Sequence, residues 1–142
     1  MYRNILVPID INHGEVGEKI VGVARHLAGA EGRITLLYVL EAVPSYVLSQ
    51  LPKDTISNNL AEAKEKLAAM ARALGAEGAA VLVKQGHSSN TILDEAEVLK
   101  ADCIVLGSHR PDYRDFLIGS TAARVVRHAQ CTVVVERSAA GG

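Results

Sequence analysis

The sequence has only two cysteines, Cys103 and Cys131, and they lie far apart in the chain. They form no CxxC motif, and their spacing is not that of metal ligands. We expect both to be reduced thiols that act as small apolar residues beside buried strands. This use of cysteine is typical of a cytoplasmic protein rather than of a secreted domain held together by disulfides.

Long apolar runs are also lacking. No run approaches the ~20 residues that a membrane-spanning helix needs. The amino-terminal stretch MYRNILVPID is too short for a signal peptide, and Pro8 and Asp10 end its apolar run. We therefore expect no membrane segment.

An excess of positive charge is absent as well. Lys and Arg number 15 against 16 Asp and Glu, so the net charge is −1. A broad nucleic-acid surface needs clustered basic residues, so this balance argues against nucleic acid as a partner. It still allows a site for one small anionic ligand.

What the sequence does contain is a regular alternation of short apolar runs with longer amphipathic stretches. The runs predict five strands at Asn4–Ile9, Arg33–Leu40, Ala79–Lys84, Asp102–Leu106 and Thr132–Glu136. The stretches predict four helices at Glu15–Leu27, Ser57–Leu74, Ser88–Lys100 and Ser120–His128, with Ser88 or Ser89 available as the N-cap of the third. Pro44–Thr55 is predicted to be irregular and mobile, and residues 137–142 are predicted to form a disordered tail.

Strands that are apolar throughout are typical of a parallel sheet covered on both faces. Right-handed crossovers then give an α/β fold with an open, doubly wound, five-stranded parallel sheet. At 142 residues, a single domain spanning 1–142 buries enough surface to be stable without metals or disulfides.

Two strand ends carry residues suited to ligand binding, because open α/β sheets bind ligands beyond the carboxyl ends of their strands. Asp10 follows the first strand, where it could accept a hydrogen bond from a ribose hydroxyl or simply cap the next helix. Gly107 ends the fourth strand, where it could let a ligand approach the backbone or simply form a turn.

The start of the last helix is the second part of this hypothesis. Gly119, Ser120 and Thr121 would present free N–H groups and hydroxyls to phosphate oxygens, or form only a loop-to-helix junction. His109 and Arg110 would add donors nearby. The two parts converge only if the first and fourth strands are neighbours, as they are in the strand order 3-2-1-4-5.

The motifs NILVPID, QGHSSNTILDEA and above all DCIVLGSHRPDYRDFLIGSTAARVVRHAQCTVVV resemble the universal stress protein family over nearly the whole chain. The resemblance implies the Rossmann-like, adenine nucleotide alpha hydrolase-like fold with strand order 3-2-1-4-5. It also implies a cytoplasmic homodimer that pairs through its last strand, Thr132–Glu136.

The resemblance further implies a site for ATP, ADP or AMP, with or without Mg²⁺. The matching positions are Pro8, Ile9, Asp10, Val39, Gly107, Ser108, His109, Gly119, Ser120, Thr121, Thr132 and Val133. The family's nucleotide-binding branch carries Gly-x2-Gly-x9-Gly-Ser/Thr after the fourth strand. Here Arg110 replaces the second glycine and eight residues separate it from Gly119, while Cys131 replaces the usual proline. Arg110 could compensate by contacting phosphate.

Three functions are compatible with these features. The first is a nucleotide-binding regulatory protein of the stress response, without catalytic activity. The second is a slow ATPase, although no GxxxxGK[ST] loop or recognised catalytic set is present. The third, which Arg110 favours, is a protein-interaction module that has the fold but binds no nucleotide.

Overall fold

The computed structural model describes residues 1–11, 14–41, 43–108 and 119–137, and the statements below concern these residues. The strands are β1 (Asn4–Pro8), β2 (Arg33–Leu40), β3 (Ala80–Gln85), β4 (Cys103–Gly107) and β5 (Thr132–Glu136). The helices are α1 (Gly14–Ala28), α2 (Ser45–Leu48), α3 (Thr55–Ala73), α4 (Ser88–Val98) and α5 (Ser120–His128). The five predicted strands and four long helices are confirmed to within two residues at almost every end.

The strands form one parallel sheet in the order β3-β2-β1-β4-β5, as predicted. β1 pairs with β2 along its whole length, from Asn4 opposite Arg33 to Pro8 opposite Leu37. On its other side β1 pairs with β4, where Ile5 faces Cys103. The chain therefore winds outward in one direction from β1 to β3 and in the opposite direction from β4 to β5.

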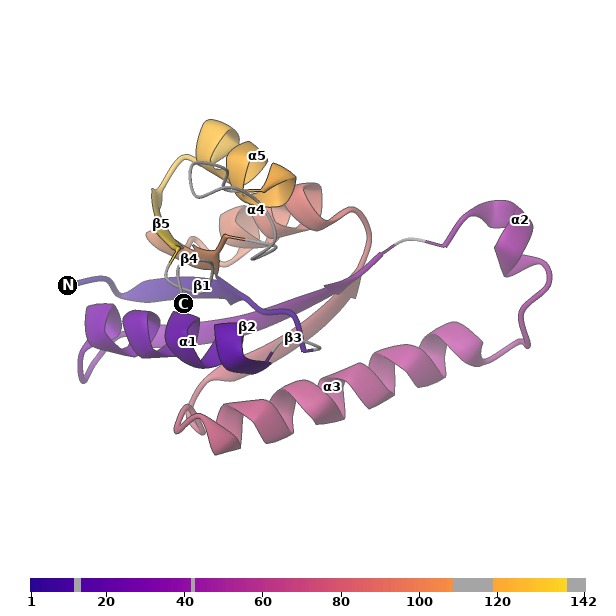
Figure 1. Cartoon of the computed structure of the whole chain (residues 1–142), viewed down its shortest axis with the longest axis horizontal. Coiled ribbons are helices and arrows are strands. Elements are labelled where there is room, and N and C mark those ends of the chain that lie inside the picture. Colours follow the sequence, from indigo (N-terminus) through magenta and orange to yellow (C-terminus); the bar gives the residue numbers. More distant parts are fainter. Residues whose placement is uncertain (12–13, 42, 109–118, 138–142) are drawn as a thin grey trace.

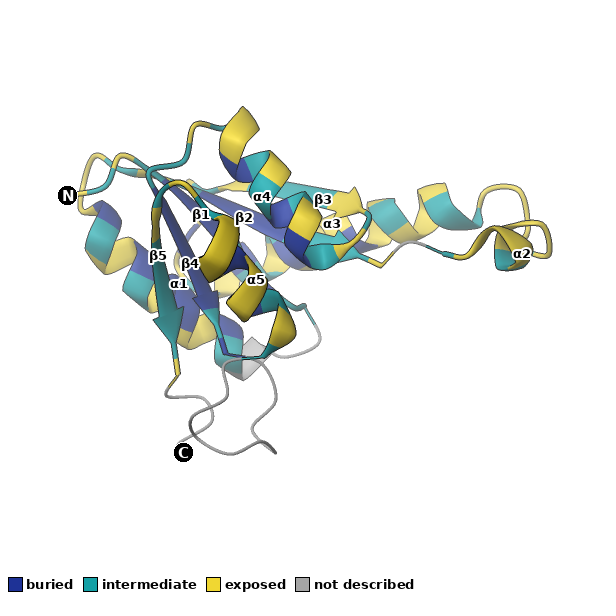
Figure 2. Cartoon of the chain, turned by 90° about the horizontal axis from the view of Figure 1, so that it is seen from above, coloured by how far each residue is buried: buried dark blue, intermediate teal, exposed yellow. Residues whose placement is uncertain are grey.

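Two helical layers cover the sheet, one on each face (Figure 1). On one face α1 and α3 pack against a core that includes Val7, Leu36 and Val105. On the other face α4 and α5 pack against Leu6, Leu37 and Ile104. Burial is concentrated in the sheet and on the inner sides of the helices (Figure 2). The alternation of side chains along each strand thus divides one apolar sequence run between two cores.

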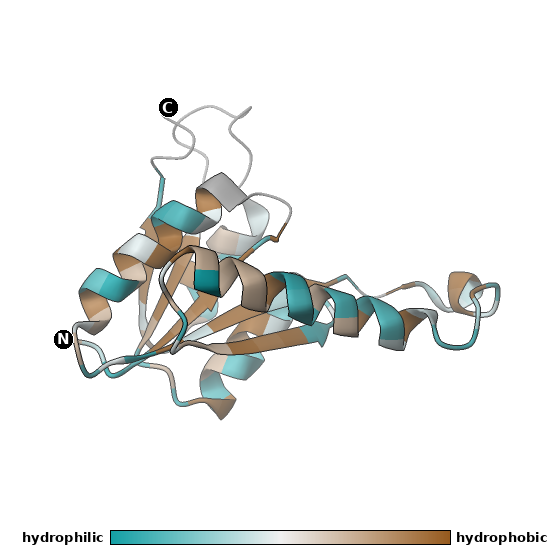
Figure 3. Cartoon of the chain, turned by 90° about the horizontal axis from the view of Figure 1, so that it is seen from below, coloured by the Kyte–Doolittle hydropathy of each residue, from teal (hydrophilic) through white to brown (hydrophobic). Residues whose placement is uncertain are grey.

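α3 is the longest helix, and its sequence pattern accounts for its place. Ala63, Leu67 and Ala71 recur every four residues and are buried on one side of the helix. Figure 3 shows the hydrophilic residues on the other side of α3. The helix ends before Gly75, whose φ of +74° is the left-handed conformation that favours glycine after a helix.

The stretch Pro44–Thr55 differs from the prediction, because it contains a short helix. α2 spans Ser45–Leu48, and α3 begins at Thr55 rather than at Ser57. Together α2 and the first turns of α3 project away from the body of the molecule (Figures 1 and 2). The prolines predicted an interruption correctly, but one helical turn fits between them because Pro44 precedes that turn and needs no N–H there.

The start of α4 also differs in detail. His87 is the N-cap residue, and no side-chain hydrogen bond caps the helix. Ser89 is fully buried, and its Oγ lies 3.2 Å from Nδ1 of His87. The serine hydroxyl is therefore used by a side-chain pair rather than by the helix end. Among the described residues, no helix combines the length and the apolar character needed to cross a membrane.

Candidate functional site

The point where the strand order reverses lies between β1 and β4. These strands are direct neighbours, with Ile5 opposite Cys103 and Leu6 opposite Ile104. Because both run in the same direction, Asp10 and Ser108 follow their strands at the same edge of the sheet. An open α/β sheet offers its ligand crevice at such a switch point.

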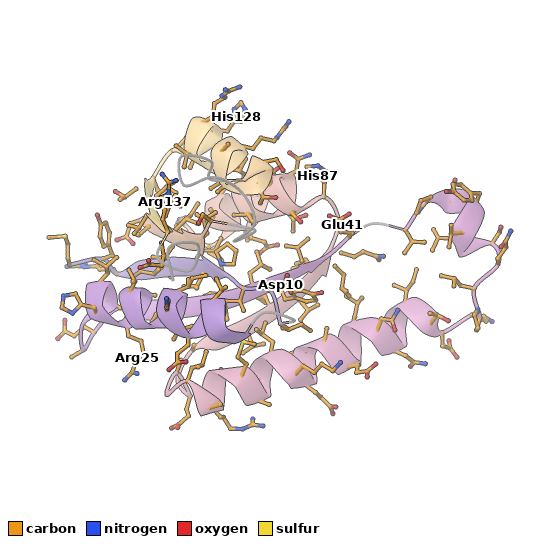
Figure 4. The ribbon with its side chains drawn as sticks, viewed as in Figure 1. Asp10, Arg25, Glu41, His87, His128 and Arg137 are labelled. Atoms are coloured by element: carbon orange, nitrogen blue, oxygen red, sulfur yellow. The ribbon has the colours of Figure 1, made fainter. Side chains whose placement is uncertain are left out.

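The segment after β1 contributes mainly backbone to this edge. Pro8 ends the strand opposite Leu37, and the N–H of Ile9 donates to the carbonyl of Leu37 at 2.8 Å. The Ile9 side chain is 4% exposed and belongs to the core on the α1 side. Asp10 is half-buried and lies beyond the end of β1 (Figure 4). Of these three predicted residues, Asp10 is therefore the one whose side chain can form hydrogen bonds with a ligand.

Gly107 serves a purpose that the sequence prediction did not foresee. A Cβ at this position would lie 2.7 Å from Cδ1 of Ile20 and 3.0 Å from Cγ1 of Val16. Both atoms belong to α1, so the missing side chain lets α1 pack closely on the end of β4. This packing gives the glycine a structural reason that holds whether or not a ligand also approaches its backbone.

Ser108 presents a polar atom without a partner at the end of β4. Its backbone N–H donates to the carbonyl of Glu136 at 3.0 Å, so it continues the β4–β5 ladder. The residue is only 6% exposed, and its Oγ has no hydrogen-bond partner among the described residues. Gly107 faces α1, so Ser108, the next residue, faces the α4–α5 side. A buried hydroxyl left unpaired costs about 1–3 kcal/mol, which a bound ligand could recover.

The amino terminus of α5 supplies N–H donors. Gly119 is the N-cap residue with φ +84° and ψ 154°, a conformation that glycine adopts readily. No side chain caps the helix, and its first turn contains no acidic residue. The exposed Ser120 and half-buried Thr121 follow directly. Uncapped N–H groups and the helix dipole together favour an anion at this end.

The other predicted positions lie in β2, in β5 and outside the described residues. Val39 is near the carboxyl end of β2 and its side chain packs in the core on the α4–α5 side, so a contact with adenine, as the resemblance implies, would be made by its backbone. Thr132 pairs with Cys103, whereas Glu136 pairs with Gly107 at the far end of the same ladder. Thr132 and Val133 thus start β5 at the amino edge of the sheet, and the structure does not bring them to the site. His109 and Arg110 lie outside the described residues.

A hollow of about 180 Å³ adjoins the site on the α3 side and was missed by the sequence reasoning. It is lined by Ile11, Tyr38, Leu40, Asn59, Glu62, Ala63 and Lys66. Tyr38, the single aromatic residue of β2, was the available signal. Typical ligand pockets measure about 300–1,000 Å³, so this hollow fits only part of a nucleotide-sized molecule.

A larger open groove of about 500 Å³ lies elsewhere, between α1 and β5. It is mainly apolar and is lined by Lys19, Gly22, Val23, His26, Leu27 and Glu136. None of the predicted ligand residues borders this groove. We therefore associate it with the exposed edge strand β5 rather than with a small ligand.

Both cysteines are free thiols at the amino edge of the sheet, opposite the candidate site, because Cys103 begins β4 and Cys131 directly precedes β5. Burial, with smaller contributions from Cys131 and Asp102, raises the pKa of Cys103 to about 11. Burial also raises the pKa of Cys131, with Asp102 adding to the effect. Such thiols stay protonated near neutral pH and are poor nucleophiles. In the described ranges, no three His, Cys, Asp or Glu side chains are grouped to hold a metal ion.

The sequence matches the model of the Universal stress protein family over residues 1–137. It is 34% identical to universal stress protein G of Escherichia coli O157:H7, and the alignment covers 96% of this chain and 100% of that protein. The solved structure of UspA from Lactobacillus plantarum superposes with a TM-score of 0.76 at 28% identity, covering 96% and 98% of the two chains. A universal stress protein solved in complex with cAMP has a TM-score of 0.61 at 19% identity, covering 95% and 96%.

Proposed function

The chain belongs to the universal stress protein family, and from this premise we propose that it binds an adenine nucleotide at the carboxyl edge between β1 and β4. The ligand is ATP, ADP or AMP, with or without Mg²⁺. The proposed role is regulatory, in the stress response of the cytoplasm, and it involves no catalysis by this chain. The occupied site would stabilise one conformation and thereby change which partner the protein binds.

The observation that carries this proposal is the convergence of three segments at the switch point. β1 and β4 are adjacent, so Asp10 and Ser108 follow them at one edge of the sheet, and α5 begins at that edge as well because it connects β4 to the parallel strand β5. The neighbour solved with cAMP supports an adenine nucleotide as the ligand class. The roles of individual residues are inferred from this chain alone.

Each segment has a distinct proposed role. Asp10 accepts hydrogen bonds from the ribose hydroxyls. The uncapped N–H groups at the start of α5, with the hydroxyls of Ser120 and Thr121, hold the phosphate oxygens. The buried Ser108 hydroxyl, which has no hydrogen-bond partner among the described residues, completes the phosphate contacts. The hollow beside Tyr38 accepts an outer part of the ligand.

We also propose a homodimer formed through β5, which is an edge strand of the sheet. An apolar strand with an unpaired edge readily adds another strand. The apolar groove between α1 and β5 adds surface that a second copy would cover. This proposal concerns assembly only and is tested separately below.

The nucleotide site is tested by placing a carboxylate at the start of α5. Ser120→Asp puts a negative charge where the phosphates would lie, and we expect the affinity for ATP to fall at least about tenfold, or about 1.4 kcal/mol. Ser88→Asp is the matched control, because Ser88 is the first residue of α4 at the β3 side of the same edge. An acidic residue in the first turn stabilises a helix, so neither variant should unfold the protein.

The measurement is equilibrium binding of ATP to the wild type and both variants, with circular dichroism to verify folding. Ser120 is preferred to Gly119 as the test position, because the positive φ of Gly119 would add backbone strain to any substitution. Equal affinities in all three proteins would show that the phosphates do not bind at α5, and the proposed site would be rejected.

A further inference from the structure

The outer surfaces of α4 and α5 carry opposite charges. The two helices lie side by side on one face of the sheet (Figure 1). On α4, Asp94 and Glu97 are exposed. On α5, Arg124 and Arg127 are exposed, and the helix contains no acidic residue. The molecule therefore presents a negative strip directly beside a positive one.

Neither strip is neutralised by the rest of the described chain. Glu95, on the flank of α4, pairs with Lys84 at 3.6 Å. Asp94, Glu97, Arg124 and Arg127 have no ion pair with any described residue. Each strip consists of two charges three residues apart, which is a rise of about 4.5 Å along a helix. The two strips therefore have the same spacing.

The two helices also expose apolar side chains. Val98 at the end of α4 is 74% exposed, and Val126 on α5 is 47% exposed. These are two of the five large hydrophobic residues that are exposed in the described part of the chain. Single exposed valines are normal on a protein surface, so the two adjacent strips of opposite charge are the feature that distinguishes this face.

We propose that this α4–α5 face binds the same face of a second copy of the chain. With a two-fold axis that runs parallel to the helices between α4 and α5, each α4 lies on the α5 of the other copy. Asp94 and Glu97 then face the two arginines of the partner, and the reverse contact forms on the other side of the axis. A face with adjacent strips of opposite charge complements itself in this arrangement.

The charge pattern favours a second copy over nucleic acid. A phosphate backbone would be attracted to α5 but repelled by the carboxylates of α4 beside it. The outer face of the helices is also distinct from the outer edge of β5, so both contacts can form at once. If β5 forms the proposed homodimer, the α4–α5 contact joins dimers into tetramers.

The contact is expected to be weak and sensitive to salt. Two short helices offer a patch well below the ~800 Å² per partner of a standard stable interface. Its charge pairs are solvent-accessible, and such pairs are screened strongly once the Debye length falls to ~3 Å at about 1 M salt. We therefore expect reversible association at low ionic strength that disappears at high salt.

Sedimentation equilibrium of the full chain at about 10 mM and about 1 M salt tests the proposal, since the Debye length is ~30 Å in the first condition. We expect the mass of the wild type to double in the low-salt buffer relative to the high-salt buffer. The doubling should be lost in an α5-reversed variant, Arg124→Glu with Arg127→Glu. It should also be lost in an α4-reversed variant, Asp94→Lys with Glu97→Lys.

The most decisive experiment is sedimentation equilibrium of an equimolar mixture of the two charge-reversed variants. One variant carries an entirely acidic face and the other an entirely basic one, so the mixture should associate at low salt although neither variant does alone. An unchanged wild-type mass at low salt, or a mixture that stays unassociated, would overturn the proposal. The mass at high salt reports the β5 dimer separately, so failure of one contact is distinguishable from failure of the other.

Discussion

The side chain of Asp102 connects the amino-terminal ends of two neighbouring strands, β1 and β4. Its carboxylate accepts the backbone N–H groups of Arg3 and Asn4 at 2.9 and 3.0 Å. Burial by itself would raise the pKa of this carboxyl, but these hydrogen bonds outweigh it and lower the pKa below its ordinary value. The ionised form therefore ties the beginning of β1 to the beginning of β4, which are the two strands that frame the candidate site.

Asp102→Asn should lower the free energy of unfolding at pH 7 by about 1–3 kcal/mol, because an amide replaces a charged acceptor. A folded pKa below the unfolded value of about 3.9 means that the ionised group stabilises the fold above about pH 4. That contribution is lost as the pH falls through the folded pKa. The measurement is urea unfolding of the variant and the wild type at several pH values. The difference between their free energies of unfolding should become smaller below about pH 4.

The matched control for this substitution is Asp54→Asn. Asp54 is exposed at the N-cap of α3, and its side chain makes no cap hydrogen bond. Two results would contradict the role given to Asp102. In the first, the loss in free energy of unfolding caused by Asp102→Asn stays constant down to pH 3. In the second, this loss is no larger than the loss caused by Asp54→Asn.

The contact that Gly107 makes with α1 could not be predicted from the sequence. Gly107 was predicted to let a ligand approach or to form a turn at the end of β4, and the structure adds its close contact with Ile20 of α1. Which neighbour approaches a glycine depends on the packing angle of a helix, and this angle is not encoded in a local motif. The unpaired hydroxyl of Ser108 likewise depends on burial, which becomes visible only when both layers are in place.

At the scale of elements, the edge strand β5 has alternating inner and outer residues. The carbonyl of Glu136 accepts the N–H of Ser108, so Glu136 directs its backbone groups toward β4. In an extended strand the neighbouring residue directs its groups the opposite way. The N–H of Val135 therefore faces the open edge, where a second copy would pair.

Val135→Pro should abolish the proposed β5 homodimer while leaving the β4–β5 ladder intact, because proline removes only the outward N–H. Val135→Ala is the control, since it keeps that N–H and should remain dimeric. The mass of each variant by sedimentation at micromolar concentration and high salt is the measurement. A dimeric Val135→Pro variant, or a monomeric wild type, would contradict pairing through β5.

Element boundaries were predictable wherever one periodicity dominated. Apolar β-branched runs predicted β1, β4 and β5, and apolar residues near one face, Leu60, Leu67, Met70 and Leu74, predicted α3. α2 was not predictable in the same way, because four residues show no period and none of them is buried. Thr132 and Val133 were assigned to the site through the family resemblance, whereas the β4–β5 register places them at the opposite edge.

At the scale of the whole molecule, the strand order determines which polar residues lie close enough together to bind one ligand. With β1 beside β4, residues about a hundred positions apart in the chain, such as Asp10 and Ser108, end at one edge. The alternation of elements predicted a parallel sheet, and the family resemblance supplied the order of its strands. Local sequence alone does not encode that order, because it results from how the crossover helices pack.

The central claim is that the edge between β1 and β4 binds an adenine nucleotide, and calorimetric titration of nucleotide-stripped protein tests it most directly. ATP, ADP and AMP are titrated separately, with and without Mg²⁺, and GTP serves as the control for the base. We predict saturable binding of at least one adenine nucleotide with a micromolar Kd, about −8 kcal/mol, and weaker binding of GTP. If none of the adenine nucleotides gives a saturable binding heat, the account is contradicted. The chain would then be interpreted as a protein-interaction module that has the same fold and binds no nucleotide.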